Sequence, residues 1–242
     1  LLRPERSGRE HRQRLAAGLA LLRIEADLTG VAVQLKTLIE RNDLACAIAR
    51  ISISRGSAPT PGYGTLAGDR PTVLVALERT MPGLARLPAV PAAVRLWLSR
   101  WRRPAPNASV NLAQTMQGMA SVMARMEAAQ QGCEEALQLS ADGTLCCAAS
   151  GNLLWHDSGR YYTPALRGGT LAGTLRARML ARWPEPVAPA LVRATPEALC
   201  SAQACVMLNS VRGAVPVSDV APLGLQFTQS EALAARCNQV IS

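Results

Sequence analysis

The feature that most constrains the fold of this chain is residues 114–164, where a methionine-rich segment leads into closely spaced turns. Apolar residues in the first half recur every three or four positions, which is the spacing of one helix face. They are Met116, Met119, Val122, Met123 and Met126. This spacing predicts a helix that packs its methionines into the core and ends near Gly132, a residue suited to a left-handed C-cap.

The second half of this stretch predicts a tight meander of strands. Residues 135–139 alternate in part, and residues 145–155 form a longer apolar run. Turn residues follow each of them, at 141–143 and at 157–159, and the second turn suits a hairpin. A return strand then ends at Pro164. Because a long helix leads directly into this meander, we expect the active surface here.

Composition narrows the class of protein. The 242 residues are 49% hydrophobic, which indicates a folded chain long enough for two modest lobes or one large α/β domain. No apolar run approaches the roughly 20 residues of a membrane span, so no membrane partner is expected. The seven cysteines have neither disulfide-framework nor zinc-site spacing, which favours a reduced, cytoplasmic protein without a structural metal.

The net charge of +9 comes almost entirely from arginine, because Lys36 is the only lysine. A basic balance is typical of proteins that bind nucleic acids or acidic metabolites. The densest basic cluster interleaves Trp97 and Trp101 with Arg100, Arg102 and Arg103. The other arginines are scattered, so we favour solvated side chains and a small anionic or amino substrate over a nucleic-acid groove.

The N-terminal part predicts two helices followed by strands. The first helix, residues 9–24, is amphipathic and carries His11 and Arg14 on its first turns. A second helix is expected at residues 31–41, and strands are expected at 46–54, 72–77 and 94–98. Prolines then cluster at residues 104–108, which predicts a linker between domains.

The C-terminal part contains a glycine-rich segment, residues 167–176, that opens a helix ending near residue 182. A helix N-terminus exposes free backbone N–H groups and the positive end of the helix dipole, which suits a phosphate. A loop that only connects two elements can have the same composition, so this pattern alone is weak evidence for a phosphate site. Further elements are expected as strands at 187–192, 205–209 and 214–217 and as a closing helix at 231–240.

Several segments resemble, in order, those of the class IV aminotransferases, which are the fold-type IV pyridoxal-phosphate enzymes. They are EHRQRL, RISISRG followed by GYG, EEAL with DG, GNLLW, YYTP, LAGTLR and LNSVRGAVPV, and they span about residues 9–217. The family includes branched-chain aminotransferases, D-amino-acid aminotransferases and 4-amino-4-deoxychorismate lyases. Residues 209–217 are most similar to the lyase branch.

The resemblance implies an α/β (α+β) architecture of two domains. A small N-terminal α/β domain would cover residues 1–103, a linker residues 104–108 and a larger C-terminal domain residues 109–242. Pyridoxal 5'-phosphate would lie between the domains, in a subunit of a homodimer. The family's first strands would precede Leu1, so this part is expected to be missing from the sequence.

The resemblance also assigns roles to individual residues. Arg14 matches an arginine that contacts the cofactor phosphate, and Ser210 matches a phosphate-binding hydroxyl position. Thr174 and Leu175 match the loop whose backbone and hydroxyl groups hold the same phosphate. Arg55 lies in the strand-to-loop motif that lines the substrate side.

Four positions depart from the family pattern. The Schiff-base lysine falls on Gln114, whose amide nitrogen is not nucleophilic and cannot form an imine. The glutamate that pairs with the pyridine nitrogen falls on Cys147, and a neutral thiol supports the ring poorly as an electron sink. Gly118 stands where the family has an aromatic or basic residue, and Pro61 where it has a second arginine.

The resemblance therefore implies a homologue of 4-amino-4-deoxychorismate lyase, which forms 4-aminobenzoate and pyruvate for folate synthesis, with impaired or lost activity. One alternative is a homologue of the branched-chain or D-amino-acid aminotransferases. A second is a pseudoenzyme that still binds the cofactor phosphate or another anion. A third is a non-catalytic anion or nucleic-acid binding module built on the basic cluster at residues 97–104.

Overall fold

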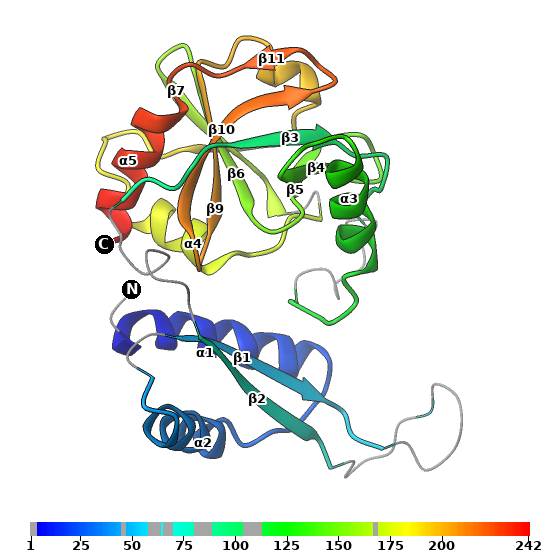
Figure 1. The fold of residues 1–242 in the computed structure, drawn as a ribbon, viewed down its shortest axis with the longest axis vertical. Coiled ribbons are helices and arrows are strands. Elements are labelled where there is room, and N and C mark those ends of the chain that lie inside the picture. Colours follow the sequence, from blue (N-terminus) through cyan, green and yellow to red (C-terminus); the bar gives the residue numbers. More distant parts are fainter. Residues whose placement is uncertain are drawn as a thin grey trace. The chain divides into compact units, whose positions relative to one another are not determined.

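The computed structural model describes residues 4–44, 47–57, 64, 70–79, 89–103, 113–166 and 169–242. The chain divides into two compact units, residues 3–85 and 86–242 (Figure 1). Among the described residues, none of the helices is both long enough and apolar enough to span a membrane.

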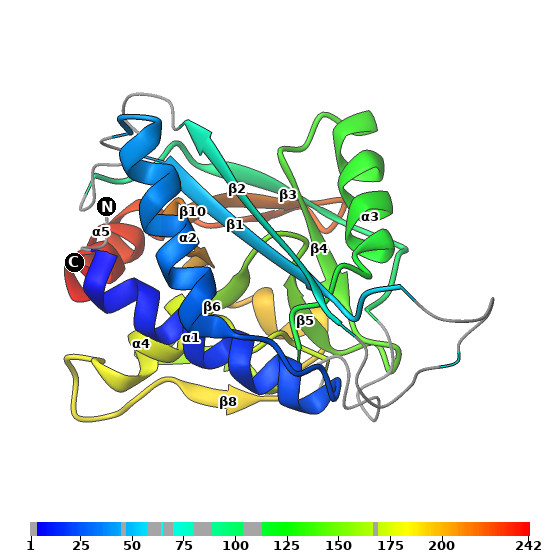
Figure 2. The same cartoon turned by 90° about the horizontal axis from the view of Figure 1, so that it is seen from below.

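The N-terminal unit consists of two helices and a two-stranded antiparallel sheet. Its elements are α1 (Pro4–Leu21), α2 (Leu28–Arg41), β1 (Ala47–Ser54) and β2 (Thr72–Arg79). Helix α2 begins after Asp27, whose Oδ1 accepts a hydrogen bond from the Thr29 N–H at 2.9 Å. It contacts β2, and Val31 is its buried residue (Figure 2).

In the C-terminal unit, nine strands of the described chain form one curled sheet in the order β5-β4-β3-β10-β9-β6-β7-β8, with β11 paired to β10. The strands are β3 (Val94–Leu98), β4 (Glu135–Leu139), β5 (Leu145–Ala148), β6 (Asn152–Asp157), β7 (Arg160–Pro164), β8 (Ala190–Val192), β9 (Ala204–Asn209), β10 (Gly213–Ala221) and β11 (Leu225–Gln226). Strand β3 is parallel to both β10 and β4, and β7 is parallel to β8. The mixed α/β fold expected from the sequence is confirmed.

The central strands of this sheet are buried on both faces. Leu153 and Leu154 are neighbours on β6 but belong to different hydrophobic clusters, because successive side chains of a strand point to opposite faces. The cluster around Leu154 is covered by helices α4 (Thr174–Ala181) and α5 (Ser230–Ile241). Burial on both faces explains why residues 204–208 are apolar without a polar alternation.

The meander predicted after residue 135 is present, but the apolar run at 145–155 is two strands and not one. Strands β5 and β6 are separated by a turn at residues 149–151. Gly151 permits this turn to lie against β9, because a Cβ there would be only 2.7 Å from the Leu208 carbonyl oxygen. The turn is closed by a bridge between Ala148 and Gly151, so β6 begins directly after it.

The prediction that the methionine-rich helix packs its methionines into the core is wrong. Helix α3 spans Met119–Gln130, so it also begins later than the sequence pattern predicts. The apolar residues of the pattern are largely exposed, namely Met116 (72%), Met119 (70%), Val122 (53%) and Met126 (53%). Ala124 and Ala128 face the sheet instead, because small side chains allow the helix to approach Trp97 and Trp101 closely.

The unit boundary lies before the domain boundary that was expected at residue 103. Strand β3 is present at the predicted residues, but it pairs with β10 and β4 of the C-terminal sheet. Residues 86–103 therefore belong to the C-terminal unit. The predicted linker at residues 104–108 and Pro61 lie outside the described residues.

Candidate functional site

Gln114, which the sequence resemblance predicts at the position of the family lysine, lies in the non-helical segment that precedes α3. Its side chain is exposed. Gly118 follows as the N-cap residue of α3 and supplies no side-chain hydrogen bond to the helix. The structure thus places at this position a neutral amide, which donates and accepts hydrogen bonds but does not attack a carbonyl carbon.

Cys147, which the sequence resemblance predicts at the position of the family glutamate, lies on β5 and is paired with Gln138 of β4. Its side chain is 5% exposed. The pKa of the Cys147 thiol is raised well above its ordinary value, first by its hydrogen bond with Cys146 and then by burial. The thiol is therefore protonated and uncharged near neutral pH, and it cannot replace the charge of a carboxylate.

Gln138 holds a buried polar network beside Cys147. Its Nε2 donates to the carbonyl oxygens of Trp101 at 3.0 Å and Ala120 at 3.2 Å. Its Oε1 accepts from Ser121 Oγ at 3.0 Å, and Ser121 Oγ in turn accepts from Arg103 Nη1 at 3.2 Å. The network joins α3, β4 and the segment after β3, and it fixes the guanidinium of Arg103 near the thiol.

Arg103 is a residue whose place in the site the sequence did not reveal. The sequence pattern puts it in the basic cluster, whereas its backbone N–H donates to the Leu139 carbonyl oxygen at 2.9 Å and its side chain is half-buried. Its Nε is buried and has no hydrogen-bond partner among the described residues. A buried donor without a partner costs about 1–3 kcal/mol, so Arg103 is poised to donate to a bound group.

Glu135 is a buried carboxylate that acts on Cys147 electrostatically, and it is already engaged. One of its oxygens, Oε2, lies 3.4 Å from Arg125 Nη1 and accepts a short hydrogen bond from Ser150 Oγ. The other, Oε1, accepts from the Ala136 N–H at 2.9 Å. These partners balance its charge within the fold.

The predicted phosphate loop forms the N-terminus of α4, with Gly173 as the N-cap residue. Asn152 holds this loop, because its Nδ2 donates to the Leu171 carbonyl oxygen at 2.9 Å. A Cβ at Gly173 would be 1.9 Å from Asn152 Oδ1, so only glycine fits there. The backbone N–H groups in the first turn of a helix point toward its N-terminus, so the loop that leads into α4 suits an anion.

Helix α4 is anchored behind this loop by buried groups. Arg176 Nε donates to Thr163 Oγ1 at 3.1 Å, and Arg176 Nη2 donates to the Pro164 carbonyl oxygen at 2.9 Å. The Leu175 side chain packs in the core with Met179. Leu175 can therefore offer a phosphate its backbone N–H only, since it lacks a hydroxyl group.

Ser210 is exposed in the turn between β9 and β10. Asn209 shapes this turn, because its Oδ1 accepts from the N–H groups of Val211 at 2.9 Å and Arg212 at 3.1 Å. Its Nδ2 donates to the Ser150 carbonyl oxygen at 2.7 Å. The turns that carry Ser210 and follow Cys147 are thus tied together, and Asn152 connects the same edge to the α4 loop.

Arg14 and Arg55 belong to the N-terminal unit. Arg14 lies on α1 with its Nη2 3.5 Å from His11 Nδ1, and burial lowers the pKa of its guanidinium. Arg55 follows β1 and donates from Nη1 to the Arg23 carbonyl oxygen at 2.9 Å and from Nη2 to the Leu22 carbonyl oxygen. Arg55 therefore binds the end of α1, a contact that the sequence pattern did not indicate.

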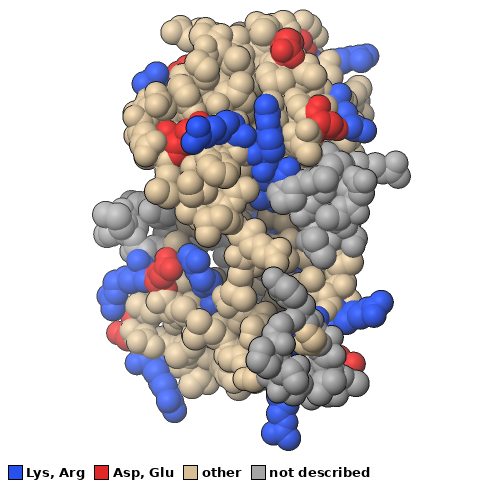
Figure 3. Space-filling model, turned by 90° about the vertical axis from the view of Figure 1, so that its right-hand side faces the viewer, with Lys and Arg blue, Asp and Glu red and all other residues tan. Residues whose placement is uncertain are grey.

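The basic cluster does not present stacking surfaces for nucleic-acid bases. Trp97 and Trp101 pack against the alanine face of α3. Arg100 lies 3.9 Å from Glu127 and 5.6 Å from the centre of the Trp101 ring. On the face drawn in Figure 3, basic side chains are scattered with acidic ones between them. These contacts do not favour the nucleic-acid alternative.

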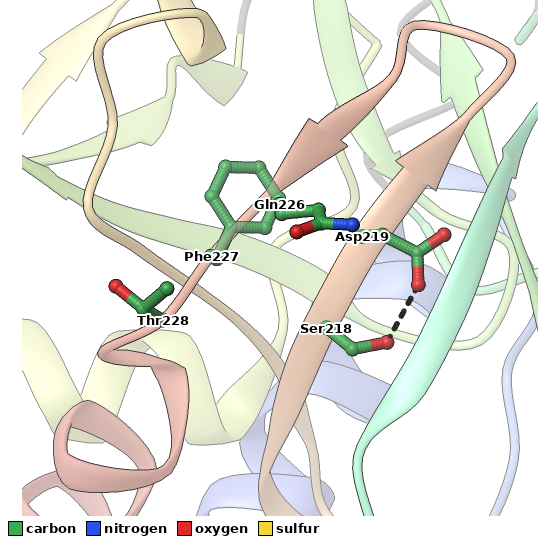
Figure 4. A pocket seen from close by; sticks show the side chains of 5 residues that line it. All are labelled: Ser218, Asp219, Gln226, Phe227 and Thr228. Carbon is green, nitrogen blue, oxygen red and sulfur yellow. Dashed lines mark hydrogen bonds between the residues drawn. The ribbon is translucent and has the colours of Figure 1, made fainter.

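A hollow of about 250 Å³ lies away from these residues, beside the β10–β11 hairpin (Figure 4). Ser218, Asp219 and Phe227 are among its lining residues. Ser218 Oγ donates to Asp219 Oδ2 at 2.8 Å, and Asp219 also pairs with Arg95 at 3.2 Å. Ser218 and Asp219 therefore already have partners, and none of the predicted site residues lines the hollow.

Comparisons with known proteins agree with the fold. The structure resembles branched-chain amino acid aminotransferase from Escherichia coli with a TM-score of 0.82 and 23% identity over 96% of this chain and 76% of that one. The TM-score with a Legionella pneumophila protein described as a putative 4-amino-4-deoxychorismate lyase is 0.78, with 18% identity over 95% of this chain and 84% of that one. The TM-score with a fold IV transaminase from Curtobacterium pusillum is 0.76, with 23% identity over 96% of this chain and 80% of that one.

A search of curated proteins found no match. The sequence model of the family named amino-transferase class IV, in contrast, matches residues 4–220. This match covers most of both units, and it includes the α4 loop, the Cys147 strand and the turn of Ser210. The chain is therefore a member of the class IV aminotransferase family.

Proposed function

We propose that this protein is a diverged member of its family that binds a phosphorylated ligand at α4 but does not form a Schiff base. The observation that carries the proposal is the exposed amide of Gln114 at the lysine position. Lys36, the only lysine of the chain, lies on α2 with an exposed side chain 3.8 Å from Glu40. Residue 114 therefore supplies no side-chain amine that could form an imine.

The two ends of the site fit pyridoxal phosphate differently. The phosphate end fits, because Gly173 and Asn152 shape a close-packed glycine loop at the N-terminus of α4. The amine and ring end does not fit, because Gln114 and Cys147 supply neither a nucleophilic amine nor a carboxylate. When bound in the usual way, the cofactor acts as an electron sink. No reaction step through it follows from these residues, so we propose binding without aldimine chemistry.

Descent from the lyase branch is supported by residues 209–217 and by the likeness to the Legionella fold. Asn209 gives this segment its shape by accepting two backbone N–H hydrogen bonds within the turn. The similarity to branched-chain aminotransferases favours the second candidate, an aminotransferase ancestor. Both candidates share the same lost lysine, so the experiment below tests what they have in common.

The test rebuilds the lysine in a chain that has no other. Lys36→Arg removes the only lysine, and Gln114→Lys in that background provides a single side-chain amine. After incubation with pyridoxal phosphate, dialysis and borohydride reduction, we expect a stable adduct at residue 114 only in the double variant. Adding Cys147→Glu should strengthen retention of the cofactor, because a carboxylate stabilises the protonated ring.

The Lys36→Arg variant alone is the matched control, since it retains the charge of the surface residue. If Gln114→Lys forms no adduct in either background while the protein remains folded by circular dichroism, residue 114 does not face the cofactor site. That outcome would contradict the proposed placement of the site. Visible absorbance from the unmodified protein would contradict the loss of aldimine chemistry.

A further inference from the structure

We infer that Arg103 replaces the family carboxylate at the ring end of the site, so that the site selects a phosphorylated aromatic ligand with an unprotonated acceptor nitrogen. This inference rests on the proposed function, because it takes α4 as the phosphate end and Cys147 as the ring end. A guanidinium in place of a carboxylate reverses the usual charge at the ring end. A group that pairs with the ring would donate a hydrogen bond there and not accept one.

The placement of Arg103 follows from hydrogen bonds along one face of the sheet. Cys147 is paired with Gln138 across β4 and β5, so the two side chains share a face. Ser121 Oγ donates to Gln138 Oε1 at 3.0 Å and accepts from Arg103 Nη1 at 3.2 Å. The backbone of Arg103 is fixed to β4 by its N–H bond to Leu139 at 2.9 Å.

Arg103 has a donor left for a ligand. Ser121 Oγ accepts from Nη1, and the guanidinium also has a hydrogen bond with the Cys146 thiol. Nε is buried and has no partner among the described residues. A donor in this state gains a hydrogen bond at little desolvation cost when an acceptor arrives. A neutral ring nitrogen accepts such a bond, whereas a protonated pyridinium would place its own N–H against the guanidinium.

The titratable and charged groups around the ring end lie on β4, β5 and α3 and on the segment after β3. On β5, Cys146 and Cys147 are thiols, and the positive charge of Arg103 acts on both. On β4, Glu135 is the carboxylate that acts on Cys147, and Arg125 of α3 lies 3.4 Å from it. Glu135 is thus paired, whereas Arg103 has no carboxylate partner among the described residues. Its positive charge therefore disfavours a second positive group nearby.

The probe is 4-deoxypyridoxine 5'-phosphate labelled with ¹⁵N in the ring. It lacks the aldehyde and therefore needs no lysine to bind. The ¹⁵N chemical shift separates the protonated from the neutral ring, and a pH titration of the complex gives the pKa of the bound nitrogen. We expect this pKa to lie at least about one unit below that of the free probe.

Variants separate Arg103 from general charge effects. Arg103→Gln should raise the bound ring pKa toward or above its value in free solution, whereas Arg103→Lys retains the charge and should keep it low. Arg100→Gln is the matched control, because its guanidinium lies beside Glu127 and Trp101 instead, and it should leave the bound ring pKa unchanged. If Arg103→Gln does not fold, the pKa of the bound ring nitrogen in the unmodified protein and in Arg103→Lys still tests the inference.

Two outcomes would overturn the inference in distinguishable ways. A bound probe whose ring is protonated at a pH where the free ring is neutral would contradict the role of Arg103 and leave phosphate binding intact. Failure of the unmodified protein to bind the probe would contradict the proposed function itself, and the inference with it. A low bound pKa that Arg103→Gln does not change would assign the effect to burial and would also overturn the inference.

Discussion

The proposed phosphate end and the proposed ring end lie against the same sheet, but they depart from the family pattern to different degrees. At the phosphate end, Gly173 is required sterically and Asn152 completes a buried hydrogen bond, so substitutions there disturb the fold itself. At the ring end, Gln114 is exposed and Cys147 is a small core residue, so the fold tolerates either residue. Residues that only chemistry requires can change while residues that packing requires persist.

The largest expected effect is at Gly173. Gly173→Ala puts a methyl group 1.9 Å from Asn152 Oδ1, and Asn152 cannot move without losing its bond to Leu171. We expect a loss of about 1–3 kcal/mol in the free energy of unfolding, and at least about a tenfold loss of phosphate-ligand affinity. Urea unfolding and titration calorimetry with the deoxypyridoxine probe would measure both quantities.

Gly118→Ala is the control for this substitution. A Cβ there would have no atom within 4 Å, so the change should be neutral or slightly stabilising. Equal losses from the two variants would show that the loop before α4 is not specially constrained.

The next largest loss of stability is expected at Gln138, whose hydrogen bonds fix the residues of the proposed ring end. Gln138→Leu removes the partner of the Trp101 and Ala120 carbonyl oxygens and of Ser121. Leaving such groups unpaired in the interior should lower the free energy of unfolding by about 1–3 kcal/mol. Inorganic phosphate affinity should nevertheless be unchanged, because the network does not contact α4. An equal loss of phosphate affinity would show that the two ends are not independent.

Buried thiols give a smaller, pH-dependent effect. Burial raises the pKa values of Cys205 and Cys237 to about 12, above that of an unfolded thiol. A raised folded pKa means that the stabilising contribution is complete below the unfolded pKa and is lost as pH rises toward the folded one. Stability should therefore fall from about pH 9, by up to about 1.4 kcal/mol per pH unit for each thiol.

Urea midpoints measured from pH 7 to pH 10 test this slope. Cys237→Ala should reduce the slope, although it also lowers stability at every pH because it removes a core side chain. An unchanged slope in that variant would show that Cys237 does not titrate with unfolding.

Chemical labelling gives the smallest of these effects and extends the comparison to Cys147. Cys200 is exposed, whereas Cys147 is buried and its thiol is protonated near neutral pH. Iodoacetamide should therefore modify Cys200 well before Cys147 in the folded protein, as peptide mass spectrometry would show. Rapid labelling of Cys147 would mean that the ring end contains an exposed thiolate and not a neutral core residue.

Sequence patterns predicted the fold class, most strands and the α4 loop, because each depends on local periodicity or on glycine. They failed where packing decides. Ala124 and Ala128, and not the methionines, face the sheet, because only small side chains fit beneath α3. Arg103 looked like a member of a surface cluster, since its inward direction depends on hydrogen bonds to Ser121 and to β4 that no local pattern encodes.

The central claim is most directly tested by the mass of the unmodified protein after treatment with pyridoxal phosphate, dialysis and borohydride. Lys36 is the only lysine, so the result is simple to interpret. The unmodified protein should show no visible absorbance band and an unchanged intact mass. A stoichiometric, reduction-stable pyridoxyl adduct that survives dialysis would contradict it and would show that the protein still holds its cofactor covalently.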